Sequence, residues 1–295
     1  MLRPRSFSLV FLLSALGAHA QLPAKKIVKP VPKEQIIACW SGQEGNKPYK
    51  KKLWDGYEIS LGPVAGEVEY ACTAAIYRAD GKVVYRTSGF NVIFDEENTG
   101  LDFDGDGRPE VVFKTDTGGG NHCCWEYNVI SLSPKPKHLF DIDQQGLVRF
   151  EKDKDGRLII WKRTQAPFST ATSMAARPFA EKVLQVRDGK LTDITPEYCA
   201  PLFTDQNQDF RIWNQDLTDA NLARLASTGP DNADNEEIVS SFFSKIAQHL
   251  FCRQFDQALT ELDRWPESSR VQLKQDFAKA VKDEYPEFAA RLSDQ

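Results

Sequence analysis

A succession of short apolar runs and glycine turns is the feature that most constrains the fold of this chain. Between residues 36 and 194 the runs are rich in β-branched and aromatic residues, and several alternate between apolar and polar positions. Such alternation is typical of strands that bury one face. Asp-Gly pairs at residues 80–81, 155–156 and 188–189 separate neighbouring runs, and Asp-Gly tolerates the positive φ of tight hairpin turns. The pattern predicts an antiparallel meander of hairpins.

The hydrophobic period changes after this region. Residues 217–225 and 236–262 place apolar side chains mostly three or four positions apart, which is typical of helices with one buried stripe. We therefore predict a mainly β domain over residues 36–194, either propeller-blade-like or a sandwich. An α-helical region over residues 195–295 is predicted to follow it.

The first 20 residues have the composition of a secretory signal peptide. Arg3 and Arg5 precede a short apolar run, which ends in the small-residue sequence Ala-His-Ala. The run is too short to span a membrane, which takes about 20 apolar residues. We expect cleavage after Ala20 and a secreted or periplasmic protein. Residues 21–35 are rich in proline and lysine and are predicted to be an extended linker.

The cysteine content indicates disulfides. All 6 cysteines lie beyond the predicted signal peptide, and an even number in an exported chain suggests pairing, although six cysteines allow about 15 arrangements. We predict a bond between Cys199 and Cys252, which would tie the entry of the helical region to the end of its apolar-striped helix. Cys39 and Cys72 would then pair with each other or with residues 123–124. Those two neighbours point apart on a strand, so we expect them to take different partners.

The sequence DFDGDGRPE, residues 102–110, combines alternating acidic residues with a glycine at its sixth position. Short acidic side chains on a tight loop supply the hard oxygen donors that calcium prefers, and Gly107 stands where a calcium loop turns sharply. An acidic hairpin turn without an ion is the alternative. The candidate ligands are the side chains of Asp102, Asp104, Asp106 and Glu110 and the backbone carbonyl of Arg108.

The loop does not continue as an EF-hand. An EF-hand has an acidic residue at its twelfth position and then enters a helix, but this position is Phe113 and the surrounding sequence alternates like a strand. The loop resembles instead the calcium loop of FG-GAP or VCBS repeats, which are found in integrin-α-like propellers. The resemblance covers residues 90–130 and implies that the acids and the carbonyl above bind calcium between two antiparallel strands. Because a propeller needs about four blades or more, this single loop predicts a blade-like sheet, a sandwich or a small incomplete ring.

The segment after the loop has other interpretations, which the sequence disfavours. The glycine run at residues 118–120 is followed by a strand-like sequence and not by the helix that a phosphate loop needs, so it is predicted to be a wide turn. His122 and Cys123 face opposite sides of that strand, which disfavours a thiol catalyst. The segment GGNHCCW, residues 119–125, is similar to segments of exported bacterial proteins of unknown role. This resemblance implies that the chain shares their origin and fold, and it implies no activity.

Two strands around the glycine run are predicted to be antiparallel neighbours, EVVFKT and CWEYNVISL. Alternation places Val111 and Phe113 on one face of the first strand, with Val112 and Lys114 on the other. We expect the first pair to face the core, because Lys114 needs solvent.

The sequence selects no catalytic residue and no facing pair of carboxylates. We expect an exported calcium-binding, β-rich binding or scaffold module of the cell envelope or exterior that is not an enzyme, with an unknown protein or glycan as its partner. A net charge of −5 disfavours binding to nucleic acid or to anionic membrane surfaces, and we expect no membrane insertion. The alternative is an extracellular hydrolase of a polymer, with calcium in a structural role. A platform of tryptophans that binds sugars is a further alternative, but most tryptophans of a β domain lie in its core. The tryptophans concerned are Trp40, Trp54, Trp125, Trp161 and Trp213.

Overall fold

The computed structural model describes residues 37–40, 48–64, 72–116, 118, 125–132, 135–144, 147–168 and 177–293. Residues 1–36 and residues Ile37–Gln295 are separate units, and the fold below is that of the second unit. The predicted signal peptide, the linker and the segment at residues 119–124 lie outside the described residues. Among the helices of the described residues, none is both long and apolar enough to cross a membrane.

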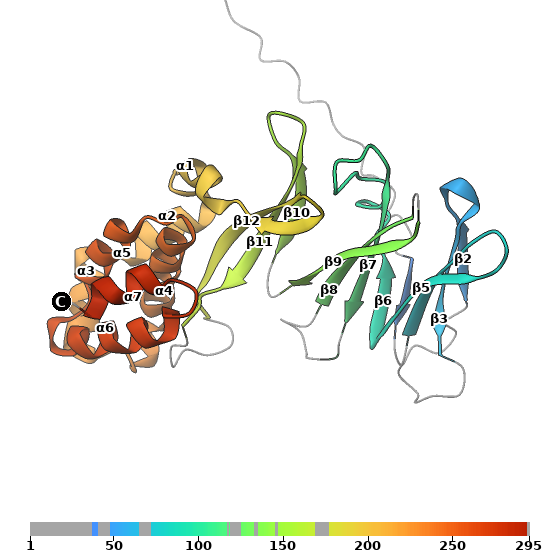
Figure 1. Cartoon of the computed structure of the whole chain (residues 1–295). Helices are drawn as coiled ribbons and strands as arrows, with labels where there is room; N and C mark the ends of the chain where they lie inside the picture. Colours follow the sequence, from blue (N-terminus) through green and yellow to red (C-terminus); the bar gives the residue numbers. More distant parts are fainter. Residues whose placement is uncertain are drawn as a thin grey trace, which may run out of the picture. The chain divides into compact units, whose positions relative to one another are not determined.

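Three antiparallel sheets account for the strands of the described residues. The first sheet contains β2 (Tyr49–Lys52), β3 (Glu58–Pro63), β4 (Cys72–Tyr77) and β5 (Val83–Gly89). The second has the order β1 (Ala38–Trp40), β6 (Asn91–Phe94), β7 (Glu110–Asp116), β8 (Trp125–Ser131) and β9 (Lys137–Gln144). The third contains β10 (Val148–Lys152), β11 (Leu158–Gln165), β12 (Phe179–Arg187) and β13 (Lys190–Asp193). Each sheet is thus built on a meander of four consecutive strands, and β1 extends the second sheet beside β6 (Figure 1).

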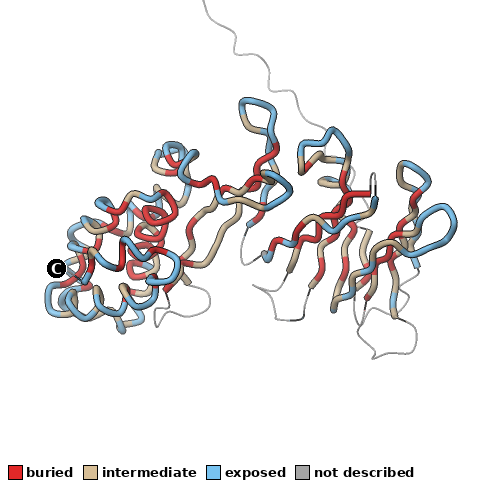
Figure 2. Tube along the Cα trace, in the orientation of Figure 1, coloured by how far each residue is buried: buried red, intermediate tan, exposed pale blue. Residues whose placement is uncertain are grey.

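Apolar side chains join the three sheets face to face in chain order. Ile59 and Ile76 of the first sheet share a buried cluster with Phe113 of the second. Val112, on the opposite face of β7, shares another cluster with Ile160 of the third sheet. In Figure 2, buried stretches coloured red run along the strands of the sheets. The described residues form a stack of blade-like meanders without a closed propeller or barrel, which confirms the predicted mainly β class.

The predicted antiparallel pairing of β7 and β8 is confirmed, but the solvent-facing position assigned to Val112 is wrong. The two strands pair antiparallel, and Val111 and Phe113 are fully buried as predicted. Val112 shares its face with Lys114, yet its side chain is 0% exposed because the third sheet covers this part of β7. Lys114 is half-buried, and its Nζ lies 4.7 Å from the ring centroid of Tyr127.

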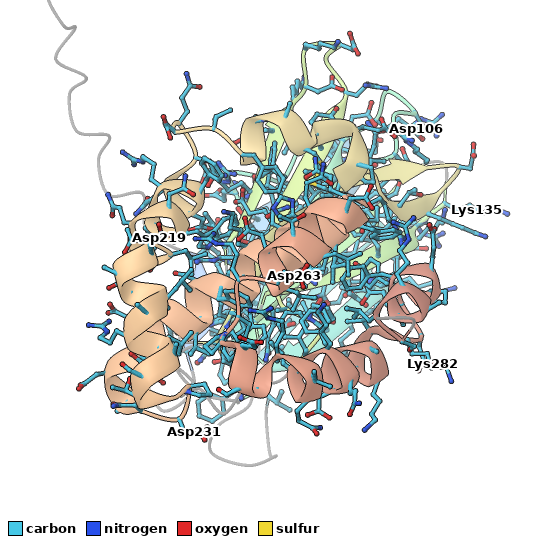
Figure 3. All side chains as sticks on the ribbon, turned by 90° about the vertical axis from the view of Figure 1, so that its left-hand side faces the viewer. Asp106, Lys135, Asp219, Asp231, Asp263 and Lys282 are labelled. Carbon is cyan, nitrogen blue, oxygen red and sulfur yellow. A yellow bond between two sulfur atoms is a disulfide. The ribbon has the colours of Figure 1, made fainter. Side chains whose placement is uncertain are left out.

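Helices follow the last strand, as the change of period predicts. They are α1 (Cys199–Leu202), α2 (Gln208–Asp216), α3 (Asp219–Thr228), α4 (Glu236–Phe251), α5 (Phe255–Leu262), α6 (Glu267–Val281) and α7 (Pro286–Ser293). Short 3₁₀ turns are η1 (Trp54–Gly56), η3 (Thr195–Tyr198) and η4 (Ala233–Asn235). The predicted apolar stripe of α4 is buried against the other helices. Charged side chains such as Asp219, Asp231 and Lys282 lie on the outer surface of this region (Figure 3).

The helix predicted over residues 236–262 is interrupted after α4. Arg253 has a φ of 57°, which is outside the range of a right-handed helix. Its guanidinium carbon lies 4.8 Å from the ring centroid of Tyr285. The chain therefore turns between α4 and α5, and the two helices pack as a hairpin.

Helix α4 covers an open edge of β12. Strand β13 pairs with the last four residues of β12, which leaves the backbone groups of Phe179 and Glu181 without a strand partner on that side. Ser244 Oγ accepts a hydrogen bond from the N–H of Phe179 (3.0 Å). The side-chain amide of Gln248 accepts from the N–H of Glu181 (2.8 Å) and donates to its carbonyl (3.0 Å). These contacts provide hydrogen-bond partners for backbone groups at the edge of β12 that would otherwise need another strand or water.

Gln248→Ala is expected to lower the free energy of unfolding by roughly 2 kcal/mol, because a buried polar group without a partner costs about 1–3 kcal/mol. The Gln248 side chain is 1% exposed, so little water reaches the backbone of Glu181 in its place. Urea denaturation followed by circular dichroism gives the measurement. Gln275→Ala, at an exposed position of α6, is the control and should change the free energy by less than about 0.5 kcal/mol. Equal stability of the two variants would show that Gln248 does not seal this edge.

Two disulfides lie within the described residues. Cys199 is bonded to Cys252, which confirms the predicted pair. Cys39 of β1 is bonded to Cys72 of β4, one of the two alternatives left open by the sequence, and this bond joins the second sheet to the first. These two bonds use all four of the other cysteines, so the prediction that Cys123 and Cys124 take different partners within the chain is wrong; the two residues themselves lie outside the described residues.

Candidate metal centre

The aspartate loop belongs to the connection between β6 and β7. Two backbone hydrogen bonds form its neck: Gly100 N–H donates to the carbonyl of Glu110 (2.8 Å), and Glu110 N–H donates to the carbonyl of Leu101 (2.9 Å). Inside the loop, the side chain of Phe103 is buried, and its ring centroid lies 5.2 Å from that of Phe150 in the third sheet. The loop is therefore fixed at its neck by the backbone and at its base by an aromatic contact.

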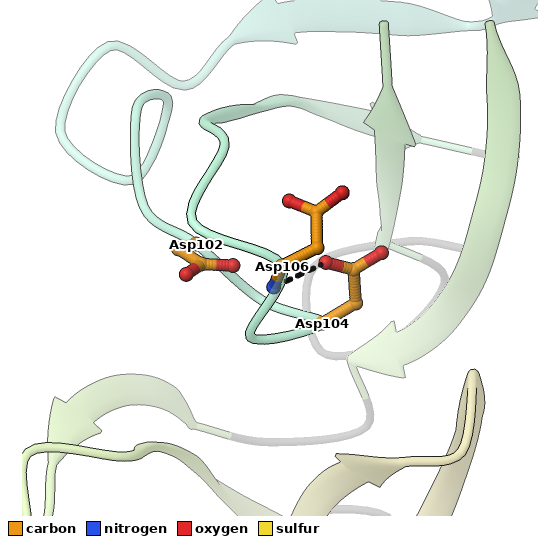
Figure 4. A group of neighbouring side chains, drawn as sticks. All are labelled: Asp102, Asp104 and Asp106. Carbon is orange, nitrogen blue, oxygen red and sulfur yellow. Dashed lines mark hydrogen bonds between the residues drawn. The ribbon is translucent and has the colours of Figure 1, made fainter. Parts of the chain in front are cut away.

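Backbone amides orient the aspartates of the loop. The two carboxylate oxygens of Asp102 accept from the N–H groups of Gly105 (2.8 Å) and Gly107 (2.9 Å). Asp104 Oδ1 accepts from the N–H of Asp106 (3.2 Å), the bond drawn in Figure 4. Gly105 and Gly107 have φ angles of 77° and 84°, which glycine adopts at no steric cost. The alternation of aspartate and glycine thus gives both the tight turn and the direction of the carboxylates.

The structure brings three of the predicted ligands together. One oxygen from each of Asp102, Asp104 and Asp106 lies within 4.8 Å of the others (Figure 4). Arg108, predicted to contribute its carbonyl, is exposed, and its N–H donates to Asp106 Oδ1 (2.9 Å). Within the described ranges, no lysine or arginine forms an ion pair with these aspartates. The loop therefore gathers negative charge that its own neighbours do not neutralise.

Glu110, the fourth predicted side-chain ligand, does not belong to this group and is 0% exposed. Its Oε2 accepts from the N–H of Phe103 (2.6 Å). Its Oε1 is also buried and has no hydrogen-bond partner among the described residues. Burial raises the pKa of the Glu110 carboxyl to about 7, and the negative charges of Asp104, Asp102 and Asp106 add to this rise. A buried carboxylate beside other carboxylates is costly unless a cation or a proton compensates it.

The hairpin between β10 and β11 shows how this chain neutralises similar acids elsewhere. Both hairpins connect the first two strands of a four-stranded meander. Asp153 Oδ1 accepts from the N–H groups of Asp155 (2.9 Å) and Arg157 (2.8 Å). The guanidinium of Arg157 donates from Nε to Asp153 Oδ2 (2.8 Å) and from Nη2 to Asp155 Oδ2 (3.2 Å). An arginine supplies the positive charge here, whereas the aspartate loop has no such cation within the described residues.

The donor set of the aspartate loop fits calcium. Its side-chain donors are carboxylate oxygens, which are hard ligands of the kind that calcium takes at six to eight positions, and sulfur and imidazole ligands are not involved. The unpartnered oxygen of Glu110 is the feature that a plain acidic turn does not explain. Sequence reasoning missed the anchoring role of Phe103; its signal is an aromatic residue between two aspartates of a polar loop.

Comparisons with known proteins provide little guidance. No protein-family model matches the chain, and no curated protein matches it. The fold has some similarity to the crystal structure of PliI-Ah, a periplasmic lysozyme inhibitor of I-type lysozyme from Aeromonas hydrophyla. The TM-score is 0.25 at 15% sequence identity, over 34% of this chain and 90% of that one. A similarity this weak supports no conclusion about ligand or activity.

Proposed function

We propose that this chain is an exported, calcium-stabilised binding or scaffold module of the cell envelope or exterior, and that it is not an enzyme. The observations that carry the proposal are the convergence of Asp102, Asp104 and Asp106 and the unpartnered oxygen of the buried Glu110, whose carboxyl interacts with their charges. A calcium ion bound there would offset the repulsion among these carboxylates and would stabilise the charged form of Glu110.

The position of the loop favours a structural role for the ion. The loop leads directly into β7, the strand that contributes Val111 and Phe113 to one core and Val112 to the other. Phe103 links the loop to the cluster between the second and third sheets. Calcium at this place would fix the entry of the central strand, and would thereby stabilise the whole stack of sheets.

Two further features support export and a binding role. Disulfides persist in oxidising compartments and are rare in the cytosol, and the bonds Cys39–Cys72 and Cys199–Cys252 fit such a compartment. The stacked sheets supply a rigid frame, on which surface loops and cavities are held in place. The partner proposed from these properties is a protein or a glycan, and the negative net charge of −5 disfavours nucleic acid.

Calcium is expected to bind the mature chain and to raise its melting temperature. Isothermal titration calorimetry on protein stripped with a chelator should show binding that Asp104→Ala abolishes. A ligand at about 100 times its Kd adds roughly 2.7 kcal/mol to the free energy of unfolding, so the rise in melting temperature should disappear in the same variant. Asp155→Ala is the matched control, because Asp155 also lies in an acidic hairpin but is paired with Arg157. If the wild-type chain binds no calcium at millimolar concentration, the proposed metal centre does not exist.

A further inference from the structure

A second candidate site is a cavity between the third sheet and the segment from α1 to α2. Its volume is about 440 Å³, which lies within the range of small-molecule sites. It is open to solvent, and none of its lining residues belongs to the aspartate loop. Its lining includes the polar and aromatic residues Arg149, Trp161, Arg163, Glu181, Asn207 and Asp209.

Aromatic rings hold the two arginines of this cavity. The guanidinium carbon of Arg149 lies 5.4 Å from the ring centroid of Trp161, and that of Arg163 lies 5.5 Å from the ring centroid of Phe179. A guanidinium that stacks on a ring keeps its N–H edge free for hydrogen bonds and loses little additional freedom when it binds an anion. The cavity therefore contains two oriented cationic donors.

The carboxylates already present use only part of this donor capacity. Arg149 Nη2 lies 3.3 Å from Glu181 Oε1, and Arg163 Nη2 lies 3.4 Å from Asp209 Oδ1; both distances are longer than usual for charged hydrogen bonds. Arg149 Nη1 also lies 3.4 Å from Glu151. Each guanidinium has five N–H donors, and the buried Nε of Arg163 has no partner in the described part of the chain. Capacity for a further oxyanion therefore remains.

The amino end of α2 adds to this positive environment. Asn207 is the N-cap of the helix, and its side chain accepts from the N–H of Phe210. The next residues, Gln208 and Asp209, line the cavity with Asn207. First-turn amides of a helix have no intrahelical acceptor, and the helix dipole makes this end favourable for anions. The two arginines and the amino terminus of α2, a helix of nine residues, thus face the same cavity.

Glu181 is poorly stabilised as a charged group in this cavity. Its side chain is 14% exposed. Burial raises its pKa and the charge of Asp209 contributes to the rise, whereas Arg149, Arg163 and a hydrogen bond with the Asn207 side chain act in the opposite direction. Because Glu181 contacts Arg149 at 3.3 Å and not through a short charged hydrogen bond, an anionic ligand competes with it for that arginine.

We propose that this cavity binds the oxyanion group, a carboxylate or a phosphate, of a small ligand, with Arg149 and Arg163 as the binding residues. The inference rests on the binding role proposed above and names the class of ligand for it. The cavity shares no lining residue with the aspartate loop, so the two sites can be tested separately.

Three sugars of one ring type test the proposal on the full mature chain: D-glucuronate, D-glucose 6-phosphate and D-glucose. Titration calorimetry should show binding of at least one charged sugar and no binding of glucose at the same concentration. Preference for glucuronate identifies a carboxylate ligand, and preference for the phosphate ester identifies a phosphate ligand. Binding of neither charged sugar at millimolar concentration, or equal binding of glucose, would overturn the proposal.

Variants of the cavity separate binding from folding. Arg163→Met and Arg149→Met should each weaken binding of the charged sugar roughly tenfold or more, because a hydrogen bond to a charged group is lost. Glu181→Gln removes the carboxylate that competes for Arg149 and should strengthen binding, a gain that a damaged fold does not produce. Arg187→Met is the control, since Arg187 pairs with Glu197 outside the cavity.

Two outcomes decide between the sites. Asp104→Ala should bind the charged sugar as the wild-type chain does, even where it has lost calcium, so failure of one site is distinguishable from failure of the other. If the charged sugar binds equally to the wild-type chain and to both arginine variants, the arginines are not the binding residues and the inference is wrong.

Discussion

Phe113→Asp is expected to unfold the chain or to remove most of its stability. The side chain of Phe113 is 0% exposed, and its ring centroid lies 5.8 Å from that of Phe94 and 6.3 Å from that of Tyr85. An aspartate at this position would bury a charge without a partner, which costs several kcal/mol in addition to the lost apolar contacts. This cost is a large share of the roughly 5–15 kcal/mol by which domains are stable.

Lys114→Asp, at the adjacent position, is the control. Lys114 is half-buried, and its Nζ lies over the rings of Tyr127 and Trp125, so the variant should lose about 1 kcal/mol from these cation–π contacts. Val112→Asp should behave like Phe113→Asp, because Val112 is also fully buried. Urea denaturation of the three variants gives the order. If Lys114→Asp were as unstable as Phe113→Asp, or less stable, the assignment of faces in β7 would be wrong.

Strand β7 shows what local pattern predicts and what it leaves open. Alternation predicted the strand, its antiparallel partner and the core-facing side of Phe113, because these depend on period and on the solvent requirement of Lys114. The burial of Val112 depends on a sheet formed by residues 148–193. Its local signal is a continuous apolar run of Val111, Val112 and Phe113, which is typical of a strand covered on both faces.

The break after α4 is a case in which tertiary contacts override local preference. Neither glycine nor proline occurs between Cys252 and Phe255, so the usual signals for a helix end are missing. Arg253 takes a positive φ, a conformation that costs a non-glycine residue about 1 kcal/mol or more. Local hydrogen bonds close the turn, from the N–H of Arg253 to the carbonyl of Leu250 (2.9 Å) and from the N–H of Gln254 to the carbonyl of His249 (2.8 Å). The contact of Arg253 with Tyr285 and the disulfide at Cys252 add support from residues distant in sequence.

The two candidate sites differ in how much the sequence predicts. The aspartates of the metal loop occupy alternate positions of one short segment, so their spacing alone indicated convergence of Asp102, Asp104 and Asp106. The cavity combines Arg149, Arg163 and Asp209, which come from two strands and a helix. Only the packing of the α1 to α2 segment against the third sheet brings them together, and no short motif encodes that arrangement.

Removal of the Cys199–Cys252 bond is expected to cost about 2–4 kcal/mol, because the bond constrains a long loop in the unfolded chain. The two residues are 53 positions apart, and the bond joins the start of α1 to the residue after α4. The double variant Cys199→Ala/Cys252→Ala should therefore unfold at a lower urea concentration than the wild-type chain. The matched comparison is Cys39→Ala/Cys72→Ala, which opens a separation of 33 residues and should cost slightly less, since the entropic term grows with loop length.

The location of this bond also links stability to the cavity. Cys199 and Cys252 pack with Leu202 and beside Trp161, and Leu202 and Trp161 line the cavity. The Cys199→Ala/Cys252→Ala variant should consequently release the α1 to α2 segment before the sheets unfold, which hydrogen exchange detects as faster exchange of the amides in α2. Unchanged exchange in α2 together with unchanged urea stability would show that packing alone, without the disulfide, holds the helical region on the third sheet.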